Sequence, residues 1–452
     1  MTKGRAGAIS ALDSRDSNNG LDCALELLIQ DLSHDGRGIA RAGQKAVFVS
    51  GALPGERVLA HVVKRHRQYD DAVADEILEA SPDRIQPHCA HAQICSGCSL
   101  QHLSPQQQIE FKQKHLIDNL ERIGKVSPQR LLAPLQRDIW GYRRKARLSV
   151  RHVDKKGKAL VGFREANGRY VAELQSCPVL DVRVGPLLGA LSALVTEMDA
   201  RASIPQIEVA AAERAVLVFR HLHPLSAGDR SRLRQFGLDH GLDIVLQPAG
   251  NDSLVDLDGA APAVLSYAID DTLSLEYLPL DFVQVNDSIN RAMIVQALDL
   301  LAVGPNDRVL DLYCGLGNFT LPLARRAASV FGVEGDAGLI ERARANASRC
   351  GIGNIDYAVA DLSLDHSGAA WAQGDYTRLL LDPPRAGAEA VFDYLPGSGV
   401  ERLVYVSCHP GTLARDTAVL VQRKGFDLVA AGVMDMFPHT AHVESMALFV
   451  RR

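Results

Sequence analysis

The residue whose type and position most directly suggest chemistry is Cys408, which follows an apolar run at residues 403–406. Such a run is typical of a buried strand, so the thiol would lie at the carboxyl end of that strand. A thiolate is a strong nucleophile, but an unperturbed thiol has a pKa of about 8.5 and is only slightly ionised at neutral pH. We therefore expect either a basic neighbour or a carbonyl of the substrate itself to promote its ionisation, with His409 and Arg385 as candidate neighbours.

A candidate general base lies near the end of the chain, in the triplet His442-Val443-Glu444. Alternate residues of an extended segment point to the same side, so His442 and Glu444 would share a face. A carboxylate is deprotonated at cellular pH without special tuning, and it can then accept a proton from a reacting carbon. We favour Glu444 as the base.

A ligand-binding turn is indicated where an apolar strand runs through Asp311 into a turn containing Gly315 and Gly317. The glycines let a ligand approach the backbone closely. A dinucleotide-binding turn would carry a third glycine where this sequence has Thr320, which counts against NAD. The turn instead resembles motif I of class I methyltransferases, whose methyl donor is S-adenosylmethionine.

Three further strand-like runs end in acids. Glu334 lies nineteen positions after Gly315, where a carboxylate can accept hydrogen bonds from both hydroxyls of a ribose. Asp361 ends the next run, where this kind of fold usually contacts an adenine edge. Asp382 begins a loop stiffened by Pro383 and Pro384, and similar loops hold flat substrates in amine methyltransferases. Parallel strands end at one edge, so the thiol would lie beside the methyl donor.

The order of strand-like and helix-like runs predicts the fold. From residue 303 onward they alternate, which favours a parallel, Rossmann-like α/β sheet, and we bound this C-terminal domain at residues 276–452. Residues 22–81 hold short apolar runs between glycine- and proline-containing turns, the pattern of a small β-barrel. Residues 1–21 are polar and fit a disordered tail.

The predicted barrel carries two turns, Gly36-Arg37-Gly38 and Leu53-Pro54-Gly55-Glu56, that resemble those of the TRAM domain, an OB-like barrel found on RNA-modifying enzymes. The basic residues 64–67 and Tyr69 would suit RNA phosphates and a stacked base. A solvated edge strand is the alternative interpretation.

Residues 82–275 form an expected central α+β domain. A helix is predicted from Ser104 to Gly124, and its apolar face is Ile109, Leu116, Ile117, Leu120 and Ile123. Residues 137–169 hold eleven Lys or Arg against three Asp or Glu, a plausible RNA-facing patch. Within it, residues 140–145 interleave aromatic and cationic side chains suited to unpaired bases, although a strand with ordinary solvated cations has the same pattern.

A group of cysteines in this domain suggests a metal centre. Cys89, Cys95 and Cys98 lie close together in sequence, and a fourth thiol follows at Cys177. Four thiolates suit either zinc or an iron–sulfur cluster, and the spacing alone does not choose between them. A structural zinc is the default interpretation of the spacing, and Cys23 and Cys350 fit no site.

The bulk properties limit the function classes. At 452 residues, 47% hydrophobic and 23% charged, the chain is long enough for two to three globular domains. It carries no signal-like N-terminus and no apolar run of about 18 residues, so we expect a soluble, cytoplasmic protein with no membrane partner. The net charge of −5 means that attraction to nucleic acid must come from local patches.

From about residue 22 to its end, the chain resembles the RNA uracil-C5 methyltransferase family. The matching stretches are Phe282-Val283-Gln284-Val285-Asn286, Asp311-Leu312-Tyr313-Cys314-Gly315-Leu316-Gly317-Asn318-Phe319, Asp382-Pro383-Pro384-Arg385, Ser407-Cys408-His409-Pro410 and His442-Val443-Glu444. The resemblance implies that Cys408 adds to C6 of a uracil, that C5 is methylated, and that Glu444 removes the C5 proton. The residues implied to contact S-adenosylmethionine are Gln284, Tyr313, Asn318, Glu334, Asp361 and Asp382.

The resemblance also bears on the partner and the metal. Relatives acting on transfer RNA lack the barrel and the cysteine group, so their presence favours 23S ribosomal RNA as the substrate. Members of that type carry a [4Fe-4S] cluster, which would be held by Cys89, Cys95, Cys98 and Cys177. The helix at residues 104–124 is further expected to pack on the catalytic domain.

Two other functions share some of these features. A DNA cytosine-C5 methyltransferase uses the same thiol chemistry but usually presents Pro-Cys where this chain has Ser407-Cys408, so we expect no DNA substrate. A non-catalytic RNA-binding protein whose cluster senses iron or oxygen would not need the complete set of catalytic side chains. The sequence gives no indication of the oligomeric state.

Overall fold

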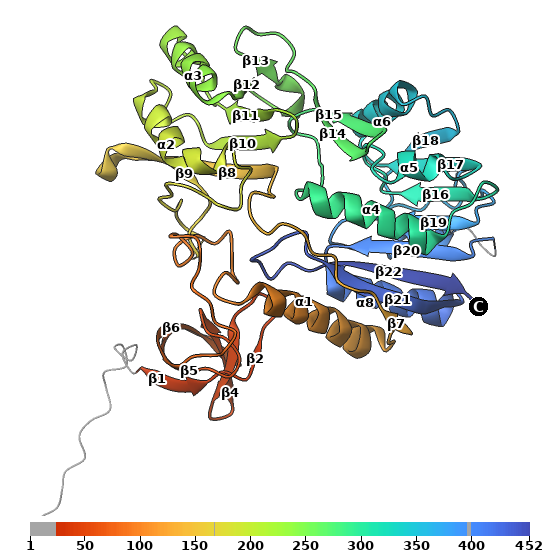
Figure 1. Ribbon diagram of the computed structural model, residues 1–452, viewed down its shortest axis with the longest axis horizontal. Coiled ribbons are helices and arrows are strands. Elements are labelled where there is room, and N and C mark those ends of the chain that lie inside the picture. Colours follow the sequence, from red (N-terminus) through yellow and green to blue (C-terminus); the bar gives the residue numbers. More distant parts are fainter. Residues whose placement is uncertain (1–23, 167, 396–398) are drawn as a thin grey trace, which may run out of the picture. The chain divides into compact units, whose positions relative to one another are not determined.

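The computed structural model describes residues 24–166, 168–395 and 399–452, which fold into two compact units, one up to Arg84 and one from Ile85 to Arg452 (Figure 1). The tail expected at residues 1–21, together with Cys23, lies outside the described residues. In the described part of the chain, no helix is both long and apolar enough to cross a bilayer.

The first unit is all-β, as the sequence predicts. Its sheet has the strand order β1-β5-β6-β4-β3-β2, and alternate side chains such as Val47 and Val49 point into a small apolar core. Gly38 is required there, because a Cβ atom would lie 2.9 Å from the side chain of Ile29. The strands are β1 (Leu25–Leu28), β2 (Asp31–Leu32), β3 (Gly38–Ala42), β4 (Lys45–Ser50), β5 (Arg57–Arg65) and β6 (Tyr69–Glu79).

The second unit begins with a six-stranded sheet of order β13-β12-β11-β10-β8-β9. Helices α2 and α3 cover one face, where Leu191 and Leu233 share a core with Leu148. The other face packs against the β14–β15 hairpin, with Val216 beside the cluster that contains Tyr267. The elements are β8 (Lys145–Val153), η2 (Asp154–Lys156), β9 (Lys158–Gly162), η3 (Gly185–Leu187), α2 (Leu188–Glu197), β10 (Gln206–Ala211), β11 (Ala215–Arg220), α3 (Ala227–His240), β12 (Asp243–Gln247), η4 (Asn251–Ser253), β13 (Val255–Asp256), β14 (Leu265–Asp270) and β15 (Leu273–Tyr277).

The C-terminal part is an eight-stranded sheet of order β18-β17-β16-β19-β20-β22-β21-β7. Strands β16 to β20 are parallel, and β22 runs antiparallel between β20 and β21. Their nearly continuous apolar sequences reflect helices on both faces. The elements are β7 (Arg130–Leu131), α4 (Asp287–Leu301), β16 (Arg308–Leu312), α5 (Thr320–Ala324), β17 (Ser329–Glu334), α6 (Ala337–Arg349), β18 (Ile355–Val359), β19 (Arg378–Leu381), α7 (Val391–Tyr394), β20 (Arg402–Ser407), α8 (Pro410–Arg423), β21 (Phe426–Met434) and β22 (Glu444–Arg451).

The predicted helix after the cysteine group is α1 (Pro105–Asn119), which continues into a π-helical turn, η1 (Leu120–Gly124). The Ser104 hydroxyl caps it by accepting the backbone N–H of Gln107. Leu116 and Leu120 belong to the same buried cluster as Phe426 of β21 and residues of α8, so the helix packs on the C-terminal sheet. Ile123, predicted on the apolar face, is half exposed in the last turn.

Candidate active site

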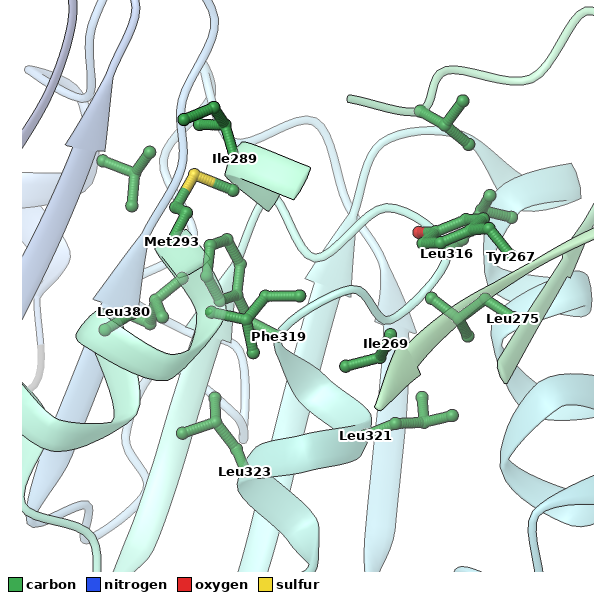
Figure 2. Packing of buried hydrophobic residues seen from close by; sticks show 14 of the residues in the cluster. Tyr267, Ile269, Leu275, Ile289, Met293, Leu316, Phe319, Leu321, Leu323 and Leu380 are labelled. Carbon is green, nitrogen blue, oxygen red and sulfur yellow. The ribbon is translucent and has the colours of Figure 1, made fainter. Parts of the chain in front are cut away.

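The glycine turn after β16 has the backbone that its sequence indicates. Gly315 and Gly317 have positive φ angles of 54° and 95°, and Tyr313 also has a positive φ, 65°. The last value is rare for a residue with a side chain, and such strain is commonly found at functional sites. Figure 2 shows the apolar packing around this turn, with Tyr267 and Ile269 on one side and α4 on the other.

Glu334 lies beside this turn at the end of β17. Its carboxylate accepts the backbone N–H of Gly315 at 3.2 Å, of Gly335 at 2.7 Å and of Asp336 at 3.1 Å. The acid predicted to bind a ribose is therefore joined directly to the glycine turn. Asp361, at the end of the neighbouring β18 strand, is exposed and accepts hydrogen bonds from Ser363, which lower the pKa of its carboxyl group.

Asp311 and Thr320 form a buried pair behind the turn. The Thr320 hydroxyl donates to Asp311 Oδ2 at 2.6 Å, while Asp311 Oδ1 has no partner among the described residues. Burial raises the pKa of Asp311 to about 7, and the nearby Asp382 and Glu334 add to this. From the sequence, Thr320 stood out only as a position where a dinucleotide-binding turn would carry glycine. In the structure, its hydroxyl holds the carboxyl group of Asp311. An unpartnered buried oxygen at this turn fits a bound ligand with a hydrogen-bond donor.

The remaining predicted cofactor residues lie around the same edge. Asn318 exchanges two hydrogen bonds with Asn290, at 2.9 and 3.0 Å, and accepts a third from Tyr267 at 3.0 Å. The half-buried Gln284 is held through its backbone, because its carbonyl accepts the Arg144 guanidinium at 2.8 Å. Asp382 follows β19, and burial, together with Glu334, raises its pKa to about 7.

Cys408 and Glu444 are brought together by the antiparallel pairing of β20 with β22. The pairing aligns Ser407 with Ser445, so Cys408 and Glu444 are the next two residues outward. Burial raises the pKa of the Cys408 thiol to about 11, and the negative charge of Glu444 contributes to this rise. The positive charge of Arg385 acts in the opposite direction.

Glu444 does not have the ordinary carboxyl pKa that its role as a base was assumed to need. Burial raises the pKa to about 8, with a further contribution from Asp382, against the lowering effect of Arg385 and Lys112. The expectation of an ionised carboxylate without tuning is therefore wrong. Sequence reasoning missed this because burial of the carboxyl and its proximity to Asp382 arise from tertiary packing, which no local pattern around residue 444 reveals.

The two candidate helpers of Cys408 have different environments. His409 Nδ1 accepts the backbone N–H of Thr412 and thereby caps α8. Arg385 lies 3.0 Å from His442 Nδ1. Since burial and Arg385 both lower the pKa of His442, the neutral ring accepts this hydrogen bond and positions Arg385. The positive charge of Arg385 lowers the pKa of the Cys408 thiol, so Arg385 remains a candidate helper.

The aromatic and basic stretch at residues 140–145 is mostly engaged within the protein. Trp140 stacks on His439 with ring centroids 3.9 Å apart, and the buried Tyr142 hydroxyl donates to Pro438 O. Arg144 is 5% exposed and pairs with Asp287 at 2.6 Å. The idea that this stretch stacks on RNA bases is therefore wrong for Tyr142 and Arg144. In the first unit, Tyr69 stacks on His66, while Lys64, Arg65 and Arg67 are exposed.

The four cysteines predicted to bind a metal line one cavity of about 30 Å³. Burial raises the pKa of Cys95 to about 11 and of Cys98 to about 12, and the neighbouring thiols add to both shifts. Backbone N–H groups donate to the sulfurs of Cys89 and Cys95. Throughout the described ranges, no three metal-binding side chains surround a single ion position. A cavity needs a volume of about 10–15 Å³ to hold one water-sized sphere. The cavity between the four cysteines therefore has room for more than one such sphere.

Comparisons with known proteins give one match in each of the two compact units of the chain. Sequence models of the TRAM domain and of the tRNA (Uracil-5-)-methyltransferase family match residues 24–74 and 266–452, respectively. The crystal structure of Pyrococcus abyssi tRNA (uracil-54, C5)-methyltransferase, in complex with S-adenosyl-L-homocysteine, has the same fold. Its TM-score is 0.71, with 24% identity over 94% of this chain and 99% of that one, a share that includes the N-terminal barrel. The expectation that relatives acting on transfer RNA lack the barrel is therefore wrong.

Several relatives are much more similar in sequence, and each is named 23S rRNA (uracil(1939)-C(5))-methyltransferase RlmD. Those of Stenotrophomonas maltophilia and Alkalilimnicola ehrlichii are 53% identical, and that of Xanthomonas oryzae is 54% identical. Each match covers 94% of this chain and 96% of the relative. With this identity over nearly the whole length, the chain belongs to the RNA uracil-C5 methyltransferase family.

Proposed function

We propose that this protein methylates C5 of one uridine in 23S ribosomal RNA, with S-adenosylmethionine as the methyl donor. The full-length relatives named for this reaction support the substrate. The structural observation that carries the proposal is the position of Cys408 opposite Glu444, at the sheet edge where β16, β17 and β19 also end. Ribosomal RNA is met in the cytoplasm, so this is where we expect the protein to act.

Cys408 acts first, because C5 of uracil is too weak a nucleophile to take a methyl group unaided. Its sulfur adds to C6, and the electron pair of the C5–C6 double bond moves to C5 and the adjoining carbonyl. The methyl donor, when bound, would supply an electrophilic methyl group: C5 forms the new carbon–carbon bond, the methyl–sulfur bond breaks, and S-adenosylhomocysteine leaves. Arg385 is the cation that favours the thiolate in a site whose burial otherwise opposes it.

Glu444 acts last, as the base that removes the proton from C5. The resulting electron pair re-forms the C5–C6 double bond and expels the Cys408 thiolate. In the free protein, burial and Asp382 keep much of Glu444 protonated at neutral pH. A charged Glu444 also disfavours the Cys408 thiolate. Once the sulfur of Cys408 is bonded to the ring, it carries no charge. Glu444 then ionises more easily than it would beside a thiolate, before it accepts the C5 proton.

The cofactor is assigned to the glycine turn and the neighbouring strand ends. Glu334 would bind the ribose and Asp361 the adenine edge, and Gln284 would hydrogen-bond the methionine end. Tyr313, Asn318 and Asp382 would complete the contacts. The unpartnered oxygen of Asp311 and the strained backbone at Tyr313 support a ligand at this turn.

The cysteine cavity is assigned to a [4Fe-4S] cluster, with structural zinc as the alternative. Cys89, Cys95, Cys98 and Cys177 would be its ligands, supported by their shared cavity and by the N–H groups directed at two of the sulfurs. We assign it no step of the methyl transfer. The TRAM unit and the exposed cations of residues 64–67 are proposed to contact RNA phosphates.

The proposal is tested by incubating the protein with unmodified 23S ribosomal RNA and methyl-labelled S-adenosylmethionine. One labelled uridine is expected, carrying the methyl group at C5, and a parallel reaction with bulk transfer RNA should remain unlabelled. Label on transfer RNA alone, or on a cytosine, would overturn the substrate assignment.

A further inference from the structure

The loop between β21 and β22, residues 435–443, leads directly into Glu444, and its backbone is held by the segment that follows the cysteines. Leu100 N donates to His439 O at 2.9 Å, and His439 N donates to the side chain of Gln108 at 2.8 Å. Ala441 N donates to Ser99 Oγ at 3.0 Å. His439 has a positive φ of 67°, so these bonds hold a backbone conformation that a non-glycine residue rarely adopts.

Lys112 also contacts this loop. It lies on α1 and is fully buried, and its ammonium group donates to Asp435 Oδ1 at 2.6 Å and to Phe437 O at 2.9 Å. Apolar residues in place of both Lys112 and Asp435 would fill this space between α1 and the sheet at similar or lower cost, since burying a charged pair involves a large desolvation penalty. The presence of an ion pair here therefore suggests a purpose other than stability.

The charge of Lys112 also acts on Glu444. The charged groups that influence the Glu444 carboxyl are Asp382 in the loop after β19, Arg385 in the same loop and Lys112 from α1. Cys408 on the neighbouring strand is in turn influenced by Glu444. Arg385 is hydrogen-bonded to His442, and its charge also acts on the Cys408 thiol. Lys112 is a buried cation that acts on Glu444 from a different element, α1.

We propose that Lys112 is a positioning residue for Glu444, which fixes the 435–443 loop through Asp435 and Phe437 and supplies a positive charge that favours the ionised base. This inference rests on the proposed role of Glu444. It assigns part of the catalytic geometry to α1, a helix outside the segment matched by the methyltransferase family model.

The proposal predicts which step depends on Lys112. Without its charge, Glu444 ionises only at higher pH, so proton removal from C5 slows at neutral pH. Formation of the bond between Cys408 and the ring does not need this proton transfer and should change less. The expected result is a methylated covalent adduct that forms normally and resolves slowly.

The experiment follows a single turnover with methyl-labelled donor and resolves covalent protein–RNA adduct from free methylated RNA. Lys112→Met/Asp435→Asn removes the pair without leaving a lone buried charge, and Lys112→Gln is a smaller change. Both should shift the pH profile of adduct resolution upward by about 0.5–1 unit, or roughly 3- to 10-fold in rate at neutral pH. Lys112→Arg, which keeps the charge, and Lys114→Met, which removes an exposed cation of the same helix, should leave the profile in place.

Glu444→Gln in the same assay separates the two hypotheses. If this variant accumulates no adduct, the role of Glu444 as base is wrong. If it does accumulate adduct, but the folded neutral variants of Lys112 keep the wild-type pH profile, only the inference about Lys112 is overturned. Loss of folding in both neutral variants would make Lys112 purely structural and would overturn it as well.

Discussion

Cys408, directly after β20, faces Glu444, the first residue of β22, one residue beyond the aligned pair Ser407 and Ser445. Because the two strands are antiparallel neighbours, the proposed nucleophile and the proposed base are held by the backbone hydrogen bonds of one sheet. Each group raises the proton affinity of the other when charged, so the two are ionised most easily at different stages of the reaction.

Replacing Glu444 by Gln should trap the reaction after methyl transfer. The amide cannot accept the C5 proton, so turnover should fall by about 10²–10⁴-fold while methylated covalent adduct accumulates. Denaturing electrophoresis with labelled donor measures both quantities. Glu341→Gln, at an exposed position of α6, is the matched control and should turn over normally. A Glu444→Gln enzyme that releases product at the wild-type rate would rule out this base.

The same substitution should alter the pH dependence of stability. The native Glu444 carboxyl keeps its proton up to about pH 8, whereas the unfolded chain loses it near its ordinary pKa of about 4.3. The native state binds more protons in this window, so this group makes stability fall as pH rises through it. The Tm of Glu444→Gln minus that of the wild type should therefore increase from pH 5 to pH 8. A Tm difference that stays constant or decreases over this pH range would show that the pKa of the native Glu444 carboxyl is not raised.

Thr320→Val should weaken cofactor binding. It leaves both oxygens of the buried Asp311 without a partner from the described residues, which costs about 1–3 kcal/mol of stability. We expect a Kd for S-adenosylhomocysteine roughly 10-fold higher, measured by calorimetry, because the glycine turn is displaced. Thr320→Ser keeps the hydroxyl and should bind normally. Equal affinity in the Val and Ser variants would contradict a role for the pair in shaping the turn.

Protein purified without oxygen should be brown and contain about four iron atoms per chain, the content of a [4Fe-4S] cluster. Cys98→Ser should lose most of this iron, whereas Cys350→Ser should retain it, because Cys350 lies against Ser274 O, away from the cavity. If the wild-type protein is colourless and contains stoichiometric zinc, the site binds zinc and the assignment to an iron–sulfur cluster is wrong.

Much of the site follows from local sequence. The glycine turn, the acids Glu334 and Asp382 and the thiol of Cys408 each end an apolar strand, and parallel strands bring such ends to one edge. The four cysteines, grouped by residue type, line one cavity, although Cys177 is distant in sequence.

Other features depend on contacts that no local pattern reveals. Lys112 and Asp435 are separated by 323 positions, and the elevated pKa of Glu444 comes from burial by elements distant in sequence. Tyr142 and Arg144 resembled RNA contacts in the sequence because aromatic and cationic side chains suit bases and phosphates as well as they suit partners inside the protein. In the structure these partners are the Pro438 carbonyl and Asp287. Residue type gives the chemistry, and tertiary packing decides the partner.

The central claim, nucleophilic attack by Cys408, is tested most directly with RNA carrying 5-fluorouridine at the target position. Fluorine at C5 cannot leave as a proton does, so the reaction should stop at a covalent adduct between protein and methylated RNA. We predict that the wild type forms this adduct in the presence of S-adenosylmethionine and that Cys408→Ala forms none, while Cys350→Ser forms it normally. An adduct formed equally well by Cys408→Ala would contradict the mechanism.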